Sequence, residues 1–278
     1  MVCGVTVLYN PTEEVFENIN SYLSRLDKLY LVDNSEKENE KLKDKFIKFS
    51  SKIEYIKMDG NEGIAKALNT VKNKAIKENY EWLLTMDQDS KFENNDFLKM
   101  LELVKKYFNE NIAIFSPFHK TIGSNYENKE IIEKDTVMTS GNLLNLKIAQ
   151  EIGDFEEKFF IDEVDHDYCY RIKKENYKII ILNRIILKHN LGNMKKYNFF
   201  SVTNHNYIRR YYITRNRLYM IKKYKDLRIK YIKDLIVDFF KILFFEDNKN
   251  LKIKMIYLGI KDFKNNIIGK INQDYLKK

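Results

Sequence analysis

Short apolar runs alternate with longer helical patterns along the first third of this chain. Four of these runs predict strands at residues 4–9, 29–32, 53–56 and 82–86, and the first of them is rich in β-branched residues. Helical patterns lie between them, with helices expected from a cap at Thr12 to about Leu26, and over residues 38–49 and 64–77. Such alternation is typical of a mostly parallel sheet covered by helices on both faces. The sequence therefore predicts an α/β fold.

The fourth predicted strand ends in two carboxylates, Asp87 and Asp89, one residue apart. Magnesium and manganese ions prefer carboxylate oxygens and leave the rest of their shell to water and substrate phosphates. In an open α/β sheet, ligands bind beyond the carboxyl ends of the strands. Two acids that leave a strand are also common in a solvated turn. The pair therefore indicates either a divalent-cation site or a simple turn.

Polar residues also follow the first two predicted strands, with Tyr9 and Asn10 after the first and Asp33 after the second. Because the carboxyl ends of parallel strands meet at one edge, we expect these residues and the two carboxylates to converge, with Asp33 placed to bind a ribose or a base edge. The turn at residues 60–63 contains two glycines that let backbone N–H groups approach a phosphate. No P-loop is present and no G-x-G-x-x-G motif follows the first strand, which disfavours ATP and dinucleotide folds.

The charge of the chain indicates an anionic partner. Its 278 residues carry a formal net charge of +9, which suits nucleic acid, a nucleotide or a lipid surface, and Lys and Arg dominate from Tyr168 onward. Cys3 and Cys169 fall in apolar segments without metal-ligand spacing, so we expect buried free thiols and a reducing cytosol. No secretory signal pattern precedes the first strand, so we expect the catalytic part on the cytosolic side.

Seven sequence elements occur in an order that is typical of one enzyme family. They are VTVLYNP at 5–11, VDNS at 32–35, GNEGIA at 60–65, DQD at 87–89, TSGN at 139–142, FIDEVDHDYCYR at 160–171 and HNLG at 189–192. In this order they resemble the family 2 inverting glycosyltransferases with the GT-A fold, and within them the bacterial rhamnosyltransferase-like group. The resemblance covers about residues 5–224 and implies a Rossmann-like, mostly parallel sheet flanked by helices, expected over residues 1–217. Residues 218–278 resemble nothing specific, and their own pattern predicts a basic, amphipathic helical region.

The resemblance implies a nucleotide site at the strand ends, formed by Tyr9, Asp33, Asn61, Gly63 and Asp87. Within it, Asp33 binds the base and Asp87 lies near the ribose. Asp89, the second acid of a DXD motif, contacts a divalent metal ion, Mn²⁺ or Mg²⁺, and His189 is a further metal ligand or a diphosphate contact. Because imidazole binds manganese better than magnesium, a ligand role for His189 favours manganese.

The resemblance also implies a catalytic base at Asp165, six residues before Arg171. Val164 stands where many relatives carry an acid, so Asp162 or Glu163 is an alternative contributor. A base must reach the acceptor hydroxyl directly while the leaving group departs from the opposite face. The other interpretation of these acids is a solvated first helical turn, because carboxylates favour helix N-termini. In that case Arg171 pairs with one of them.

The family pattern assigns two further groups of residues. Gly141, Asn142 and Asp162 are expected to line the pocket for the sugar and the acceptor. Arg215 and Asn216 resemble a closing segment that clamps the diphosphate through charge-assisted hydrogen bonds. A solvated helix face is the alternative for these last two residues.

Residues 231–245 carry apolar side chains at helical spacing, with lysines between them. Charged residues interrupt the stripe too often for a helix that spans a membrane. We expect it to lie on the inner face of a bacterial cell membrane, with its apolar face buried and its lysines among anionic headgroups. Core packing or a homodimer interface predicts a similar stripe.

These expectations combine into one leading function. The chain is expected to be a metal-dependent inverting glycosyltransferase that moves a sugar, rhamnose from dTDP-rhamnose, to a glycan or a lipid-linked acceptor, without binding nucleic acid. A nucleotidyltransferase is the first alternative, although it should carry a Gly-rich, Arg-Lys loop after the first strand, where Tyr9 and Asn10 stand. A non-catalytic protein that binds nucleic acid or membrane is the second alternative, and salt-dependent affinity for DNA or RNA would indicate it.

Overall fold

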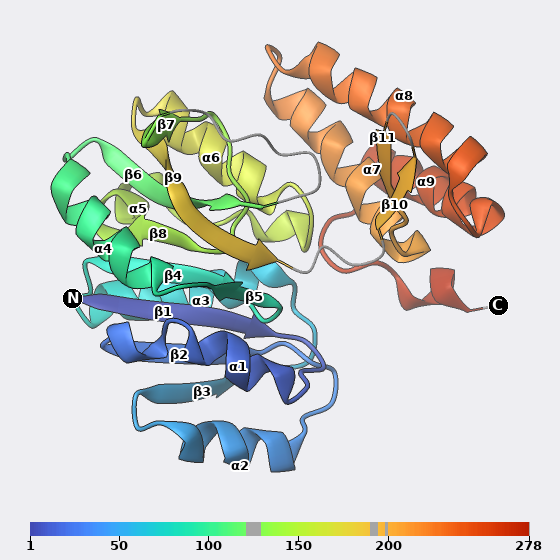
Figure 1. Ribbon diagram of the computed structural model, residues 1–278. Helices are drawn as coiled ribbons and strands as arrows, with labels where there is room; N and C mark the ends of the chain where they lie inside the picture. The colour runs from blue at the N-terminus through green and yellow to red at the C-terminus, as the bar shows by residue number, and fades with distance from the viewer. Residues whose placement is uncertain (121–128, 190–193, 198–199, 278) are drawn as a thin grey trace. The chain divides into compact units, whose positions relative to one another are not determined.

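The computed structural model describes residues 1–120, 129–189, 194–197 and 200–277. The chain forms two compact units. The first, here called the sheet unit, comprises Met1–Phe155 and Asp165–Asn190. The second, here called the helical unit, comprises Glu156–Val164 and Leu191–Lys278. Figure 1 shows the elements of both units along the chain.

One mixed sheet forms the centre of the sheet unit. Its described strands are β1 Val2–Leu8, β2 Lys28–Asp33, β3 Ile53–Lys57, β4 Trp82–Asp87, β5 Ser90–Phe92, β6 Ile112–His119, β7 Ile131–Glu133, β8 Asn142–Asn145 and β9 Lys178–His189. They run in the order β3-β2-β1-β4-β8-β6-β9-β5, and β7 pairs with β9. The first four strands are parallel, as their alternation with helices predicts. β8 then runs antiparallel to both β4 and β6.

Helices cover both faces of this sheet (Figure 1). They are α1 Glu14–Asn20, α2 Glu40–Phe49, α3 Ile64–Lys77, α4 Asp96–Tyr107, α5 Leu146–Ile152 and α6 Val164–Lys174. α1, α2 and α4 share one apolar core with the strands, in which Phe46 and Phe97 are almost fully buried. α3 packs against β1, β4 and α5, on the opposite face in Figure 1. α3 spans the predicted residues, and the predicted α/β architecture is confirmed.

The first helix is shorter than its sequence pattern predicts. α1 ends at Asn20, and a 3₁₀ turn replaces the rest of the expected helix. The Ser21 hydroxyl donates to the Asn18 carbonyl at 2.7 Å, and such local side-chain bonds compete with the helical ladder. The predicted cap is also wrong, because Glu13 and not Thr12 is the N-cap residue, and it makes no side-chain capping bond.

Three helices form the described core of the helical unit: α7 Tyr207–Lys223, α8 Arg228–Phe245 and α9 Lys249–Lys264. α7 packs along both α8 and α9, which contact each other little (Figure 1). Gly259 permits this close packing, because an added Cβ atom would lie 2.8 Å from the Tyr211 carbonyl oxygen. The hairpin β10 Met194–Tyr197 and β11 Phe200–Thr203 and a 3₁₀ helix, Gln273–Leu276, belong to the same unit.

The expected C-terminal region begins inside a helix. Residue 218 lies within α7, which continues to Lys223, so the functional division expected after residue 217 stays a prediction. The expected amphipathic helix is present as α8. Among the described helices, none is both long enough and apolar enough to cross a bilayer.

We predict that His205 makes the stability of the protein depend on pH. Burial, followed by the charges of Arg209 and Arg210, lowers the pKa of His205 to about 3. Between that value and the ordinary value of 6.5, only the unfolded chain binds the extra proton, so stability is complete above this window and is lost as pH falls through it. The loss is at most about 1.4 kcal/mol for each pH unit. Urea unfolding of the wild type and His205→Gln at pH 5 and 7.5 measures it.

Carboxylates also titrate in acid, but they contribute equally to both proteins, so only the difference between the two is compared. We expect His205→Gln to lose less stability at pH 5 than the wild type. Equal losses in the two proteins would contradict the assignment to His205.

Candidate active site

The register of β1 with its two neighbours brings the predicted nucleotide residues together. β1 lies between β2 and β4, with Leu8 opposite Asp33 and Val7 opposite Asp87. The two acids therefore flank the carboxyl end of β1, directly before Tyr9. This is the edge of an α/β sheet at which ligands bind.

Asp33 is buried and held in one orientation. Its side chain accepts a hydrogen bond from the Tyr55 hydroxyl at 2.6 Å and from the Ser35 backbone N–H at 2.9 Å. Burial, reinforced by the bond to Asp33, raises the pKa of Tyr55, so the phenol keeps its proton and remains the donor. Sequence reasoning missed Tyr55, although its place in β3, the strand that pairs with β2, is a signal that could have found it.

The turn at residues 60–63 is attached to the same edge through asparagine side chains. Asn34 donates to the Asn61 side chain at 3.2 Å and accepts from the Glu62 N–H at 2.8 Å. Asn61 also accepts from the N–H of Gly63, which has a φ of +88° and precedes α3. These bonds place Asn61 and Gly63 beside the end of β2. They also occupy two N–H groups that the sequence suggested for a phosphate.

Gln88 connects the chain segments that leave β1 and β4. Its side-chain oxygen accepts from the Tyr9 N–H at 2.9 Å, and its amide nitrogen donates to the Tyr9 carbonyl at 3.1 Å. The Asp87 N–H donates to the Ser140 hydroxyl at 3.0 Å. The segment that carries Asp87 and Asp89 is therefore fixed on both sides, and Asp89 is exposed to solvent.

The donor atoms at the end of β4 fit a divalent cation. In the antiparallel pair of β5 and β9, Ser90 lies opposite His189, so the His189 backbone lies next to the segment that carries Asp89. The His189 side chain lies outside the described part of the structure, and the described side chains include no group of three His, Cys, Asp or Glu able to hold a metal ion. Two carboxylates on a strand end nevertheless suit magnesium or manganese, which usually keep water or phosphate ligands.

The loop at residues 139–142 lies against β4. Thr85 donates from its hydroxyl to the Thr139 carbonyl at 2.6 Å, and its own carbonyl accepts from the Gly141 N–H at 2.7 Å. Gly141 has a φ of +83°, and an added Cβ atom would lie 2.6 Å from Pro117 Cγ and 2.9 Å from Leu187 Cδ2. Both its conformation and its surroundings therefore require glycine.

Asp165 lies beside the predicted sugar-pocket residue Asn142. Both line a cavity of about 20 Å³, together with Thr85, Thr139 and Tyr168, which is space for about one water molecule. The backbone N–H of His166 donates to Asp165 Oδ1 at 2.9 Å. Asn142 donates to the Met138 carbonyl, but its buried Oδ1 meets no donor among the described residues. The cavity thus contains a carboxylate and a buried acceptor.

Asp167 has a structural position instead. Its side chain is fully buried and pairs with Arg171 at 3.1 Å. The same guanidinium donates to the carbonyl oxygens of Ile152 at 2.8 Å and Asp154 at 2.6 Å. The expectation that Arg171 pairs with an acid of this stretch is confirmed. Cys3 and Cys169 are buried free thiols, also as expected.

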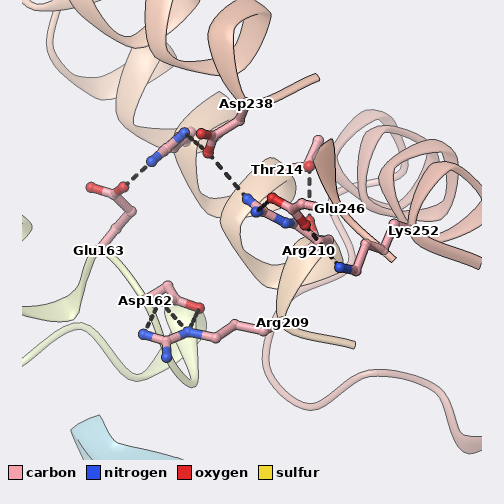
Figure 2. Close-up of polar contacts among 9 residues, drawn as sticks. Asp162, Glu163, Arg209, Arg210, Thr214, Asp238, Glu246 and Lys252 are labelled. Atoms are coloured by element: carbon pink, nitrogen blue, oxygen red, sulfur yellow. Dashed lines mark hydrogen bonds and ion pairs between the residues drawn. The ribbon is translucent and has the colours of Figure 1, made fainter. Parts of the chain in front are cut away.

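Three predicted site residues lie in the helical unit and bind other protein groups. Asp162 accepts three hydrogen bonds from the Arg209 guanidinium at 2.9 to 3.2 Å, and Figure 2 shows this contact. Arg215 and Asn216 are fully buried. Asn216 donates to the carbonyls of residues 159, 161 and 162, and Arg215 to those of residues 158, 159 and 269. Both hold the chain before α6, and the expected diphosphate contact stays a prediction.

Solved structures share this fold. GalNAc-T7, crystallised with UDP, GalNAc and Mn²⁺, superposes with a TM-score of 0.57 at 14% identity, over 68% of this chain and 42% of that chain. The present chain therefore spans less than half the length of that one. S. aureus TarS 1–349 superposes with a TM-score of 0.52 at 12% identity, over 95% of this chain and 72% of that chain. The predicted GT-A fold class with C-terminal helices is confirmed.

The family that the sequence matches defines the chain as a glycosyltransferase. The chain belongs to Glycosyl transferase family 2, which matches residues 5–172. It is similar to the dTDP-rhamnosyl transferase RfbF of Shigella flexneri, with 28% identity over 237 residues that cover 77% of this chain and 78% of the relative. The predicted resemblance to the rhamnosyltransferase-like group is confirmed, and the two alternative functions lose their support.

We predict that Gly141→Ala lowers the free energy of unfolding by about 1–3 kcal/mol, because the added methyl group clashes with Pro117 and Leu187. Urea unfolding measures the change. Gly153→Ala is the matched control, since Gly153 has a φ of +87° but no atom within 4 Å of an added Cβ, so only the cost of its backbone conformation applies. An equal loss of stability in the two variants would show that Pro117 and Leu187 move aside for the added methyl group.

Proposed function

We propose that this glycosyltransferase is inverting and metal-dependent, and that it transfers rhamnose from dTDP-rhamnose to a hydroxyl of a cell-surface glycan or lipid-linked acceptor. The observation that carries the proposal is the convergence of Asp33 and Asp87 at the carboxyl end of β1. Similarity to a dTDP-rhamnosyl transferase supports the choice of donor.

The strand ends supply the groups that a nucleotide diphosphate needs. Asp33, oriented by Tyr55, accepts hydrogen bonds from the base, and the 46% exposed side chain of Tyr9 offers a ring beside it. Asp87 lies next to the ribose. Asn61 and Gly63 shape the turn that borders the same pocket.

Asp89, beside the ribose contact Asp87, would hold the metal ion, with His189 as a further ligand or a diphosphate contact. When bound, the ion acts as a Lewis acid that offsets the negative charge on the departing diphosphate. Both acids lie on a segment that Gln88 and Ser140 fix by hydrogen bonds. The carboxylates are therefore presented by a rigid strand end and not by a free loop.

Asp165 acts as the general base in this proposal. The His166 N–H orients its Oδ1, and the carboxylate removes the proton of the acceptor hydroxyl as that oxygen attacks the sugar carbon. Asn142 Oδ1, which meets no donor among the described residues, accepts a hydrogen bond in the same pocket. Attack opposite the departing diphosphate inverts the anomeric centre in one step, without a covalent intermediate.

We predict that Asp165→Asn lowers transfer by about 10²–10⁴-fold, because it removes the base, and leaves metal-dependent nucleotide binding intact. Asp89→Ala should weaken nucleotide and metal binding together. The measurements are a rate of rhamnose transfer and a thermal-shift screen of UDP, dTDP, GDP, CDP and ADP with Mn²⁺, Mg²⁺ or EDTA, since binding to the native state raises its melting temperature.

Asp44→Asn, at an exposed position on α2, controls for loss of a carboxylate and should change neither quantity. Full transfer by Asp165→Asn would move the base elsewhere. An unchanged metal dependence in Asp89→Ala would refute the ligand assignment. A folded wild type that responds to no nucleotide would refute the donor class.

We further propose that α8 binds the surface of an anionic membrane. One face of the helix carries four exposed apolar side chains, Ile229, Ile236, Phe240 and Phe244, which are 82%, 51%, 51% and 62% exposed. Soluble proteins rarely expose so many neighbouring apolar side chains. Residues 218–278 contain fifteen Lys and Arg against seven Asp and Glu, so this region carries eight of the nine net positive charges. An apolar helix face surrounded by cations suits anionic lipid.

We predict that the double change Phe240→Ser and Phe244→Ser lowers partition onto phosphatidylglycerol vesicles at least about tenfold, because burial of each phenyl ring contributes about 1.5–3 kcal/mol. Co-sedimentation measures it, with phosphatidylcholine vesicles as the uncharged comparison. Phe108→Ser is the control, since Phe108 is 53% exposed in the sheet unit. If the double variant sedimented with the vesicles as well as the wild type does, α8 would be excluded as the membrane contact. If the wild type were a dimer and the double variant a monomer, the stripe would be assigned to contact with a second copy of the chain.

A further inference from the structure

The segment before α6 holds three non-glycine residues in left-handed conformations. Phe160, Asp162 and Glu163 have φ values of +67°, +61° and +63°. Phe160 forms a γ-turn, in which the Ile161 N–H donates to the Phe159 carbonyl at 2.8 Å. Such conformations are unfavourable for residues with a Cβ atom and persist only where the surroundings hold them.

Glu163 is held by two helices through its side chain. Its carboxylate accepts from Arg217 Nε at 3.3 Å and from the Tyr231 hydroxyl at 2.9 Å. The side chain is only 6% exposed, and each oxygen binds a different helix, α7 or α8. Because both of its oxygens are bound, this carboxylate is not available to remove a proton from a substrate. Glu163 therefore does not share the role of catalytic base, which the sequence left open for it.

The contacts of Glu163 continue into a series of ion pairs within the helical unit. Arg217 also donates to Asp238 at 2.9 Å, and Asp238 accepts from Arg210 at 3.3 Å. Arg210 pairs with Glu246 at the end of α8. Figure 2 shows this succession of charges from Glu163 to Lys252, which pairs with Glu246 at 2.8 Å. Alternating charges thus join α7, α8 and α9 to the residue before α6.

Arg217, the residue at the centre of these ion pairs, keeps its positive charge. Burial alone would lower the pKa of Arg217, but the carboxylates of Asp238 and Glu163 outweigh that effect and raise it. Buried ion pairs are weak sources of stability, because apolar side chains of similar volume often serve as well. A buried series of ion pairs is better explained by the single arrangement of side chains that it specifies.

We propose that Glu163, held by Arg217 and Tyr231, is a positioning residue that fixes the first turn of α6 and thereby the direction of Asp165. Glu163 directly precedes the first residue of α6, and Asp165 is the second residue of that helix. A displacement of a reacting group by about 1 Å can cost about 10²-fold in rate. The proposal rests on the proposed base role of Asp165.

The test is a double-mutant cycle of Glu163→Gln and Asp165→Asn, with kcat, KM and nucleotide-induced thermal shift measured for each protein. Glu163→Gln should lower kcat about 10- to 100-fold, with an unchanged KM for the donor and an unchanged thermal shift. In the Asp165→Asn background the same change should cost less than about twofold, because Glu163 acts only through Asp165.

Tyr231→Phe is the milder second variant, which removes one hydroxyl and should lower kcat alone by a few-fold. Tyr257→Phe, at a 66% exposed position on α9, is its control and should behave as wild type. A full kcat in Glu163→Gln, a raised KM, or the same loss in both backgrounds would overturn the positioning role. A wild type that transfers no sugar and binds no nucleotide would overturn the proposed function and this inference together.

Discussion

Parallel pairing of β1 with β2 and β4 is the constraint on which the donor side of the site depends. Successive residues along a strand point to opposite faces of the sheet, so a slip of one position would turn every side chain of a strand to the opposite face. The observed register places Asp33 and Asp87 on either side of the end of β1. Tyr55, Asn34 and Gln88 then hold the segments that follow.

A second constraint acts on the chain before α6. Its left-handed residues cost about 1 kcal/mol or more each, and hydrogen bonds to buried carbonyls offset this cost at about 1 kcal/mol each. Asn216 and Arg215 supply those bonds, and Arg217 binds the Glu163 side chain. The chain directly before α6 is therefore held by α7, a helix about fifty residues later in the sequence.

Local patterns predicted the elements that depend on local physics. Short apolar runs predicted the first four strands, and a glycine turn followed by a continuous helical pattern placed α3 at its observed residues. The same reasoning failed at α1, because the Ser21 hydroxyl binds the carbonyl of Asn18 and the helix ends early. A pattern of apolar positions does not show which side chain will compete for a backbone carbonyl.

The sequence by itself determined the α/β class, the acids that follow the strands and the order of motifs that belongs to Glycosyl transferase family 2. Only the tertiary structure decided what Arg215 and Asn216 bind, that Asp167 is taken by Arg171, and that Asn142 and Asp165 share a cavity. The reason is physical. Strand and turn preferences arise from neighbouring residues, whereas burial and hydrogen-bond partners arise from groups such as Asn216 and Phe159, which are 57 residues apart in the sequence.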